Sequence, residues 1–287
     1  MIKTINNLFV YKTLLLLLFV YSTVVYGQYT NELTPQYYAY AQARNSLVEQ
    51  NRQLPCVDKT LSIAVYIVRD SLGNPNILES NINMAIDSLN KLFSPICLSF
   101  NICSIEYIDN YQWDTLIVND DNGKHEEEQM VTTYHKDSTI NLYFIKAFKN
   151  LPGEYGLSAY PGGCDNIIIE KDHVNDKTIP HQFGRFFGLL PTFGMGNSQE
   201  LVDGSNCETT GDFLCDTEAD PQNSPYFSLS TTSNCELANP QTDNNNQFYL
   251  PPTDNIMSFY RNCRVRFTKQ QYRIMAFEYL NNRNYLW

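Results

Sequence analysis

The sequence of 287 residues predicts an α+β fold. Residues 61–68 (LSIAVYIV) form a continuous apolar run of strand length, which is typical of a strand buried on both faces. Residues 81–93 carry apolar side chains at steps of three and four, so they predict an amphipathic helix lying on that sheet. Residues 203–252 are instead rich in Asn, Asp, Thr, Ser and Pro, and they predict a loop-rich region.

The other elements follow in chain order. A helix is expected within residues 37–50. Further strands are expected at residues 96–108, 139–148, 155–160 and 166–170, with 155–160 at the sheet edge. A further helix follows the strand at 166–170, because Pro180 suits a first helical turn and Thr178 suits an N-cap. Residues 120–129 are expected to form a polar loop, and a terminal helix is expected over about 268–280.

Residues 1–27 have the features of a secretory signal peptide. Lys3 and Lys12 supply the positive start, and an apolar stretch follows before a plausible cleavage site at Gln28. The alternative is an uncleaved membrane anchor, but the apolar run is short for a bilayer and residues 21–23 (YST) interrupt it. The sequence therefore predicts a secreted or periplasmic protein with no membrane span after signal cleavage.

Charge and cysteine content narrow the class of protein. The formal net charge is −11, and the absence of a basic stripe argues against nucleic acid as a partner. Eight cysteines fit an oxidising compartment, and the lack of any C-x-x-C pair favours disulfides over a cysteine metal site. Cys97 and Cys103 would lie roughly 20 Å apart on one straight strand, too far to bond to each other. Cys56 and Cys164 are the other upstream candidates. Cys207, Cys215, Cys235 and Cys263 allow two disulfides in three pairings.

Residues 181–193 (HQFGRFFGLLPTF) keep the spacing of a metalloprotease zinc helix, H-E-x-x-H-x-x-G-x-x-H. The corresponding positions hold His181, Gln182, Arg185, Gly188 and Pro191. Arg185 has no lone pair to give to a metal, and Pro191 has no donor atom. Gln182 carries an amide where a general base is needed. Only His181 remains as a ligand, so we expect no catalytic zinc. Taken in isolation, His181 could also be an ordinary helical histidine.

Short sequence segments that follow the motif in a fixed order strengthen the comparison with metalloproteases. They are Asn206-Cys207, Gly211-Asp212, residues 215–220 (CDTEAD), residues 255–259 (NIMSF), Cys263, Phe267-Thr268 and Gln271. With the helix, these blocks resemble the pappalysin family of secreted zinc metalloproteases over about residues 60–285. The resemblance makes Met257 the methionine of a Met-turn. Phe259 stands where the family has a tyrosine that supports the transition state. The chain therefore resembles a degenerate member.

The resemblance implies a metzincin-like fold over residues 60–287. An upper subdomain (about 60–190) would hold a mixed, twisted sheet with backing and active-site helices. A lower subdomain (about 191–287) would be irregular and held by disulfides, with a cleft between the two. Residues 28–59 would form an N-terminal arm or a pro-like segment.

Acidic residues suggest a second metal. Asp203, Asp212, Asp216 and Thr217, with Glu200 and Asp220 nearby, offer the oxygen ligands that calcium prefers. The resembling family holds calcium in this region in some members. The alternative is a network of hydrogen-bonded turns, and the sequence leaves both open. His125 with residues 126–128 (EEE) is a poor metal site, because that stretch is expected to be solvated.

Three functions remain. The first is a catalytically inactive pseudoprotease that binds a peptide or protein in its cleft. The second is an active zinc endopeptidase with a non-standard site, in which His173, Asp172 and Glu170 would assist His181. The third is a structural module of the secreted or envelope fraction.

Overall fold

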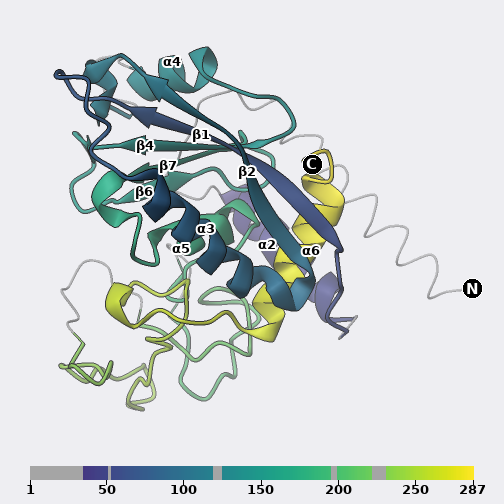
Figure 1. Ribbon diagram of the computed structural model, residues 1–287. Helices are drawn as coiled ribbons and strands as arrows, with labels where there is room; N and C mark the ends of the chain where they lie inside the picture. The colour runs from purple at the N-terminus through teal and green to yellow at the C-terminus, as the bar shows by residue number, and fades with distance from the viewer. Residues whose placement is uncertain (1–34, 51–52, 119–124, 195–198, 222–230) are drawn as a thin grey trace, which may run out of the picture.

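The computed structural model describes residues 35–50, 53–118, 125–194, 199–221 and 231–287. The expected signal peptide lies outside the described residues. The main sheet has five strands in the order β2-β1-β4-β7-β6. They are β2 (Leu98–Ile108), β1 (Lys59–Val68), β4 (Ile140–Ile145), β7 (Asn166–Glu170) and β6 (Gly156–Ser158) (Figure 1). The first four run parallel, and edge strand β6 runs antiparallel to β7. The predicted α+β class is confirmed.

The apolar run of β1 is explained by its place inside the sheet. Ile63, Val65 and Ile67 point into the core on one face, and the residues between them, Ala64 and Tyr66, point into the core on the other. This alternation follows the two-residue period of a strand. Both faces are covered, so every position from 63 to 68 is buried.

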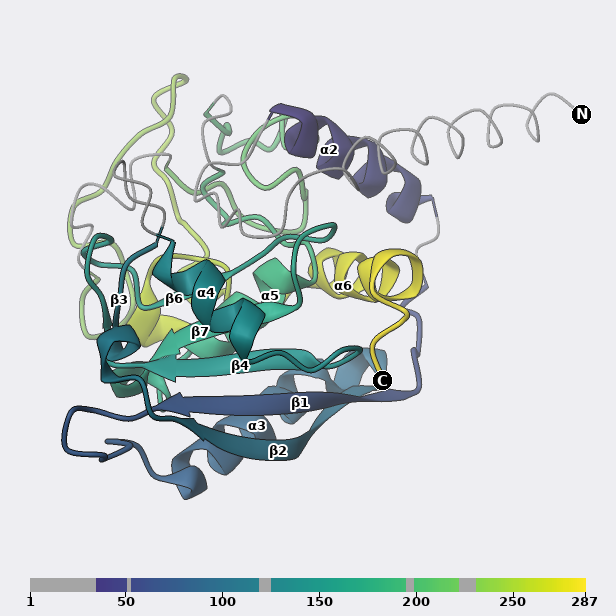
Figure 2. The ribbon, with the colours of Figure 1, turned by 90° about the horizontal axis from the view of Figure 1, so that it is seen from above.

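Three helices cover one face of the sheet and smaller elements cover the other. The first face packs against α3 (Glu79–Phe93), α5 (Thr178–Phe186) and α6 (Lys269–Asn282). The opposite face packs against α4 (Glu126–Thr133) and a two-stranded sheet of β3 (Thr115–Leu116) and β5 (Ala147–Phe148) (Figure 2). None of the described helices combines the length and the apolar character that crossing a bilayer requires.

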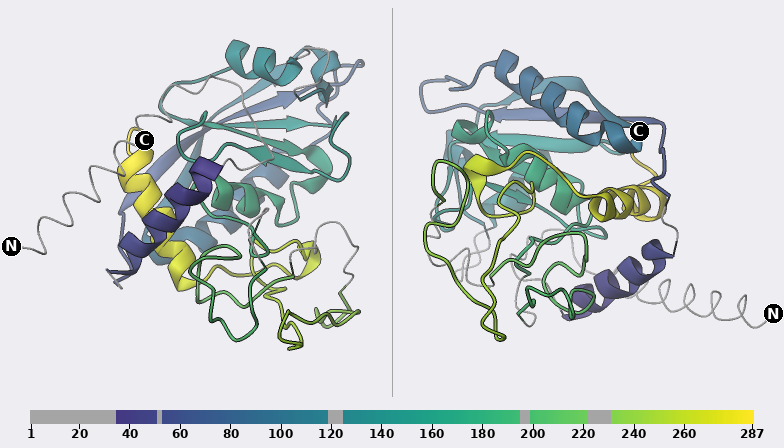
Figure 3. Two further views of the ribbon diagram at one scale, coloured as in Figure 1. Left: turned by 180° about the vertical axis from the view of Figure 1, so that it is seen from behind. Right: turned by 90° about the horizontal axis from the view of Figure 1, so that it is seen from below.

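The N-terminal arm is built into the protein. Helix α2 (Pro35–Glu49) lies along α6 (Figure 3). Arg44 Nη1 lies 2.6 Å from Glu278 Oε1 of α6, and these side chains are 1% and 0% exposed. Tyr40 donates a hydrogen bond to the same carboxylate oxygen at 2.9 Å. A buried, hydrogen-bonded ion pair of this kind makes α2 part of the core rather than a loosely attached segment.

Loops form the region between α5 and α6, and disulfides hold them. Within the described part of residues 199–268, backbone pairing is limited to isolated bridges and one short 3₁₀ turn. Two disulfides, Cys207–Cys215 and Cys235–Cys263, close loops in this region, as expected. A third, Cys56–Cys97, ties the segment before β1 to the start of β2. Cys103 and Cys164 lie outside these three bonds.

Three local details differ from the sequence predictions. Residues 126–129 begin helix α4 instead of continuing a loop, because Glu127, Met130 and Val131 share one buried face. Residues 139–148 form two strands, since the chain leaves the main sheet at Lys146 and Ala147–Phe148 pairs with β3. Thr178 is the first residue of α5 and not its N-cap. Its N–H donates to Asp176 Oδ1 at 2.7 Å instead.

Candidate functional site

Helix α5 carries the zinc-type motif into the centre of the molecule. It follows β7, and all nine of its residues are buried. The chain leaves the helix at Gly188, whose φ of +85° is one that glycine adopts without strain. Arg44 Nη1 donates to the Gly188 carbonyl at 2.9 Å, and a Cβ at this glycine would lie only 2.6 Å from that nitrogen. The motif glycine is therefore explained by the turn and by the close approach of α2.

Gln182, at the position of the general base, fastens α5 to the edge strand. Its Nε2 donates to the Gly156 carbonyl at 2.8 Å, and its Oε1 accepts from Ser158 Oγ at 2.8 Å. Both polar atoms of the amide are thus used within a side chain that is 4% exposed. The arrangement suits an amide, because the same side chain must donate at one end and accept at the other.

His181 is turned toward the segment that contains Met257. Its Nδ1 donates to the Ile256 carbonyl at 2.9 Å, and the Phe259 ring lies edge-on at 6.2 Å between centroids. Burial lowers the pKa of His181 well below its usual range, and the charge on Arg264 acts in the same direction. The imidazole is therefore neutral, with its Nδ1 proton committed to the backbone.

Met257 and the residues at the end of the motif lie together beneath α5. A Cβ at Gly184 would lie 2.5 Å from Met257 Sδ, so the thioether packs directly against the helix backbone. The Thr192 N–H donates to the Met257 carbonyl at 3.3 Å, which brings the chain after Pro191 to the same place. The ring of Phe193 packs edge-on against Phe259 with 4.8 Å between centroids. The structure thus brings the Met257 segment and the end of the motif together beneath α5.

Arg185 lies one helical turn beyond His181, on the same side of α5. The residue is 5% exposed, and its Nε is buried with no hydrogen-bond partner among the described residues. None of the ion pairs between described residues includes it. Its guanidinium carbon lies 5.1 Å from the centroid of the Tyr160 ring. Arg185 is therefore a buried cation held by an aromatic face.

Two more guanidinium groups add positive charge near His181. Arg264 is 4% exposed and donates from Nε to the Ser258 carbonyl at 2.7 Å. Burial lowers its pKa to about 9. Arg261 donates to the Gly153 carbonyl at 2.8 Å and lies 3.6 Å from the Tyr155 ring centroid. Neither arginine belongs to an ion pair between described residues.

The side chains present do not fit a catalytic zinc. Zinc in a hydrolase takes three protein ligands of neutral or anionic type and a water. Here the motif supplies one ligand, His181 through its Nε2, because its Nδ1 donates to the Ile256 carbonyl, and it places a cation at the second ligand position. Among the residues that the structure describes, no group of three or more His, Cys, Asp or Glu side chains is arranged to hold a metal ion.

The residues proposed for a non-standard site lie in other contacts. His173 Nδ1 lies 2.6 Å from Asp176 Oδ2, and its ring stacks on Tyr155 at 3.8 Å. Glu170 Oε1 accepts from the Phe148 N–H at 2.8 Å. Asp172 lies in the 3₁₀ turn that follows β7. No contact links these side chains to His181, so the geometry offers no support for an altered metal centre.

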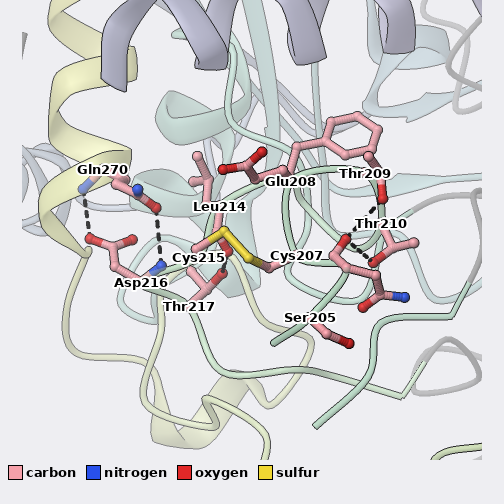
Figure 4. Close-up of a disulfide and its surroundings, with 12 residues drawn as sticks. Ser205, Cys207, Glu208, Thr209, Thr210, Leu214, Cys215, Asp216, Thr217 and Gln270 are labelled. Atoms are coloured by element: carbon pink, nitrogen blue, oxygen red, sulfur yellow. Dashed lines mark hydrogen bonds between the residues drawn. A yellow bond between two sulfur atoms is a disulfide. The ribbon is translucent and has the colours of Figure 1, made fainter. Parts of the chain in front are cut away.

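The calcium candidates are dispersed over local turns and contacts with α6. Asp203 accepts from the Ser205 N–H, and Asp212 Oδ1 accepts from Leu214 N–H and Thr217 Oγ1. Asp216 exchanges two hydrogen bonds with Gln270 at the start of α6 (Figure 4). Beside these contacts lies the disulfide Cys207–Cys215 (Figure 4). These bonds fit the turn-network alternative, and calcium at these residues stays a prediction.

Three neighbouring carboxyl groups are buried more deeply than the sequence indicates. Glu200 is 3% exposed, and burial, with the nearby Asp212, raises its pKa to about 9. Glu200 Oε2 and Asp212 Oδ2 have no hydrogen-bond partner among the described residues. Asp220 accepts from Thr192 Oγ1 at 2.6 Å and from Tyr260 OH at 3.0 Å, and burial raises its pKa to about 7.

A groove of about 450 Å³ lies away from the motif. It is lined by α2, by the loop around Cys215, and by Gln270 and Ile274 of α6. Its walls include neither His181 nor Arg185. The groove follows from the docking of α2, which the sequence resemblance did not cover.

Sequence reasoning missed Tyr160, Arg261 and Arg264. Residues 261–266 (RNCRVR) do hold three arginines within six positions of an acidic chain, a local signal that could have been noticed. No pattern marks Tyr160, because its position over Arg185 arises from tertiary packing alone.

Comparisons with known proteins show no family for this chain. No family model and no curated protein matches the chain. Among solved structures, it is similar to one described as "Structure of a chaperone-substrate complex", with 11% identity and a TM-score of 0.30. The match covers 54% of this chain and 28% of that chain, so it spans little more than a quarter of the solved protein. A likeness at this level identifies neither a fold nor a function.

Proposed function

We propose that this chain is a secreted pseudoprotease of the pappalysin type, which binds a peptide or protein beside α5 and β6 without cutting it. The order of blocks in the sequence supports the resemblance. The parallel sheet with an antiparallel edge strand, and Met257 packed beneath the zinc-type helix, are consistent with a metzincin-like fold. The three disulfides fit an oxidising compartment.

The observation that carries the proposal is the use of Gln182. In an active enzyme, this position needs a carboxylate that is free to take a proton from water. Here both ends of an amide are bonded to β6, at 2.8 Å each. The amide at the base position of the motif is a structural link that holds the edge strand in place, and under the proposal a peptide binds along that strand without hydrolysis.

Capture of uncut peptides tests the proposal. The mature protein is immobilised and exposed to a tryptic digest of the native secretome, and bound peptides are eluted and measured by mass spectrometry. We expect a defined set of retained peptides, each with intact tryptic ends. An Asp109→Asn variant, changed in an exposed ion pair far along the chain from the motif, serves as the matched control and should retain the same set.

Two results would contradict the proposal. Retained peptides with new, chelator-sensitive termini would indicate an active peptidase. Failure to retain any peptide above the level of an unrelated secreted protein would favour a structural module.

A further inference from the structure

We infer that Arg185 forms the recognition site for a carboxylate of the bound peptide, at the place where the motif would otherwise hold a metal. The inference rests on the proposed function for the source of the ligand. The anion site itself follows from the contacts of Arg185 and can be tested without any peptide.

The first step is the cost of burying Arg185. A guanidinium stays protonated in proteins, and its removal from water is unfavourable unless hydrogen bonds and an opposite charge compensate. Arg185 is 5% exposed, its Nε lacks a partner, and no described carboxylate forms an ion pair with it. The ring of Tyr160 offsets only part of this cost, because a cation–π contact lacks the charge of a carboxylate.

The second step is the charge of the surroundings. Arg264 and Arg261 lie close enough to His181 to lower its pKa, as Arg185 does, so the three cations share one neighbourhood. The nearby carboxylates Glu154, Glu170 and Asp176 act on Arg261, and Asp176 also acts on Arg264. These carboxylates act on Arg261 and Arg264, whereas no ion pair between described residues neutralises Arg185 itself. A buried cation without a counter-charge attracts an anion.

The third step is the identity of the anion. The planar fork of arginine matches a carboxylate through two parallel hydrogen bonds, and the Tyr160 ring lies over the guanidinium with 5.1 Å between its centroid and the guanidinium carbon. A peptide lying along β6 would carry such a group at its C-terminus or on an Asp or Glu side chain. The former metal position thus holds a fixed cation that binds a ligand carboxylate.

Thermal unfolding with small anions tests the site directly. Acetate and succinate are added at constant ionic strength, with chloride as the reference and with phosphate and sulfate as further arms. We expect the carboxylates to raise the Tm of the wild-type protein and to have no such effect on Arg185→Met. Without carboxylate, Arg185→Met should be at least as stable as the wild type, because it removes an uncompensated buried charge. The matched control Arg69→Gln, which alters an exposed ion pair, should respond to carboxylates as the wild type does.

Binding measurements with modified peptides then distinguish whether the carboxylate comes from the C-terminus or from an acidic side chain. One retained peptide is compared with its C-terminally amidated form, and with an amidated form whose acidic side chains are changed to amides. The form that loses affinity, by about tenfold or more, identifies the group bound by Arg185. Arg185→Lys should bind more weakly than the wild type because it keeps the charge but not the fork.

The outcomes separate the two proposals. Carboxylate stabilisation that depends on Arg185, combined with no peptide binding, supports the anion site and contradicts the proposed function. Equal carboxylate responses in the wild type and Arg185→Met overturn the inference. A destabilised Arg185→Met protein also overturns it, because the arginine would then be structural. A stronger effect of phosphate or sulfate overturns the assignment to a carboxylate.

Discussion

Gln182 and Gly156 are joined across the boundary between α5 and the edge strand, with Gln182 Nε2 donating to the Gly156 carbonyl at 2.8 Å. The bond lies between a side chain of the zinc-type helix and the backbone along which a peptide would add to the sheet. The side chain at the base position of the motif thus holds the edge strand against α5.

Placing a glutamate at position 182 alone should destabilise the fold. In Gln182→Glu, a carboxylate would face the Gly156 carbonyl with no proton to donate, so we expect a loss of about 1–3 kcal/mol in the free energy of unfolding at neutral pH. Urea unfolding measures this loss. It should shrink at acidic pH, where a protonated carboxyl can donate. A variant as stable as the wild type at neutral pH would show that the amide link is dispensable.

The contact between Gly184 and Met257 should behave as a coupled pair. A Cβ at Gly184 would lie 2.5 Å from Met257 Sδ, so Gly184→Ala should destabilise the protein by about 1–3 kcal/mol. Met257→Ala leaves a cavity that the new methyl group can partly fill. The double variant should therefore lose less than the sum of the single variants in a double-mutant cycle. If the losses in the free energy of unfolding of the two single variants simply add, Met257 does not contact the helix at Gly184.

Removing the partner of Arg44 should reveal how firmly α2 is held. Glu278→Gln leaves a buried guanidinium without a counter-charge, and we expect a loss of about 3–5 kcal/mol in the free energy of unfolding. Asp109→Asn, in an exposed pair, should cost less than about 1 kcal/mol. Limited proteolysis should cut within residues 35–50 only in the Glu278 variant. Ready removal of this helix from the wild type would restore the view of it as a pro-segment.

Stability should fall as pH rises through the range in which Glu200 and Asp220 lose their protons. Burial raises the pKa of Glu200 from 4.5 to about 9 and that of Asp220 from 3.8 to about 7. Between the unfolded and folded pKa values, the folded protein binds more protons than the unfolded chain. The stabilisation that these two protonated carboxyl groups contribute is therefore complete below about pH 4, and it is lost as the pH approaches 9.

Urea midpoints across this pH range measure the effect, and Glu200→Gln should flatten the slope above pH 7. Glu236→Gln, at an exposed position, is the matched control and should leave the slope unchanged. A wild-type midpoint that rises between pH 7 and 9 would contradict the burial of a protonated Glu200.

The sequence predicts the main sheet and the helices packed on it, because the apolar periods of these strands and helices are long and regular. The buried run of β1 and the amphipathic face of α3 are unambiguous signals. The α4 helix was missed because Glu127 is an acidic residue yet 0% exposed, and a polar sequence gives no sign of such burial. The disulfide pairing could not be derived, since four cysteines in loops allow three pairings.

The candidate site was predictable in part. The family resemblance implies a Met-turn at Met257, and the structure places His181 against the Ile256 carbonyl beside it, while Gln182 and Arg185 stand where the motif has a base and a ligand. The bond from Gln182 to Gly156 and the ring of Tyr160 over Arg185 depend on long-range packing, which leaves no local pattern. The same is true of Asp220, whose carboxylate joins Thr192 to Tyr260.

Zinc titration of the secreted, mature protein tests the central claim most directly. Calorimetry is carried out on the wild type and on the triple variant Gln182→Glu, Arg185→His and Pro191→His, with peptide cleavage measured on the same samples. We predict no stoichiometric zinc binding and no chelator-sensitive cleavage for the wild type. One tightly bound zinc per wild-type chain, with cleavage that a chelator abolishes, would contradict the claim.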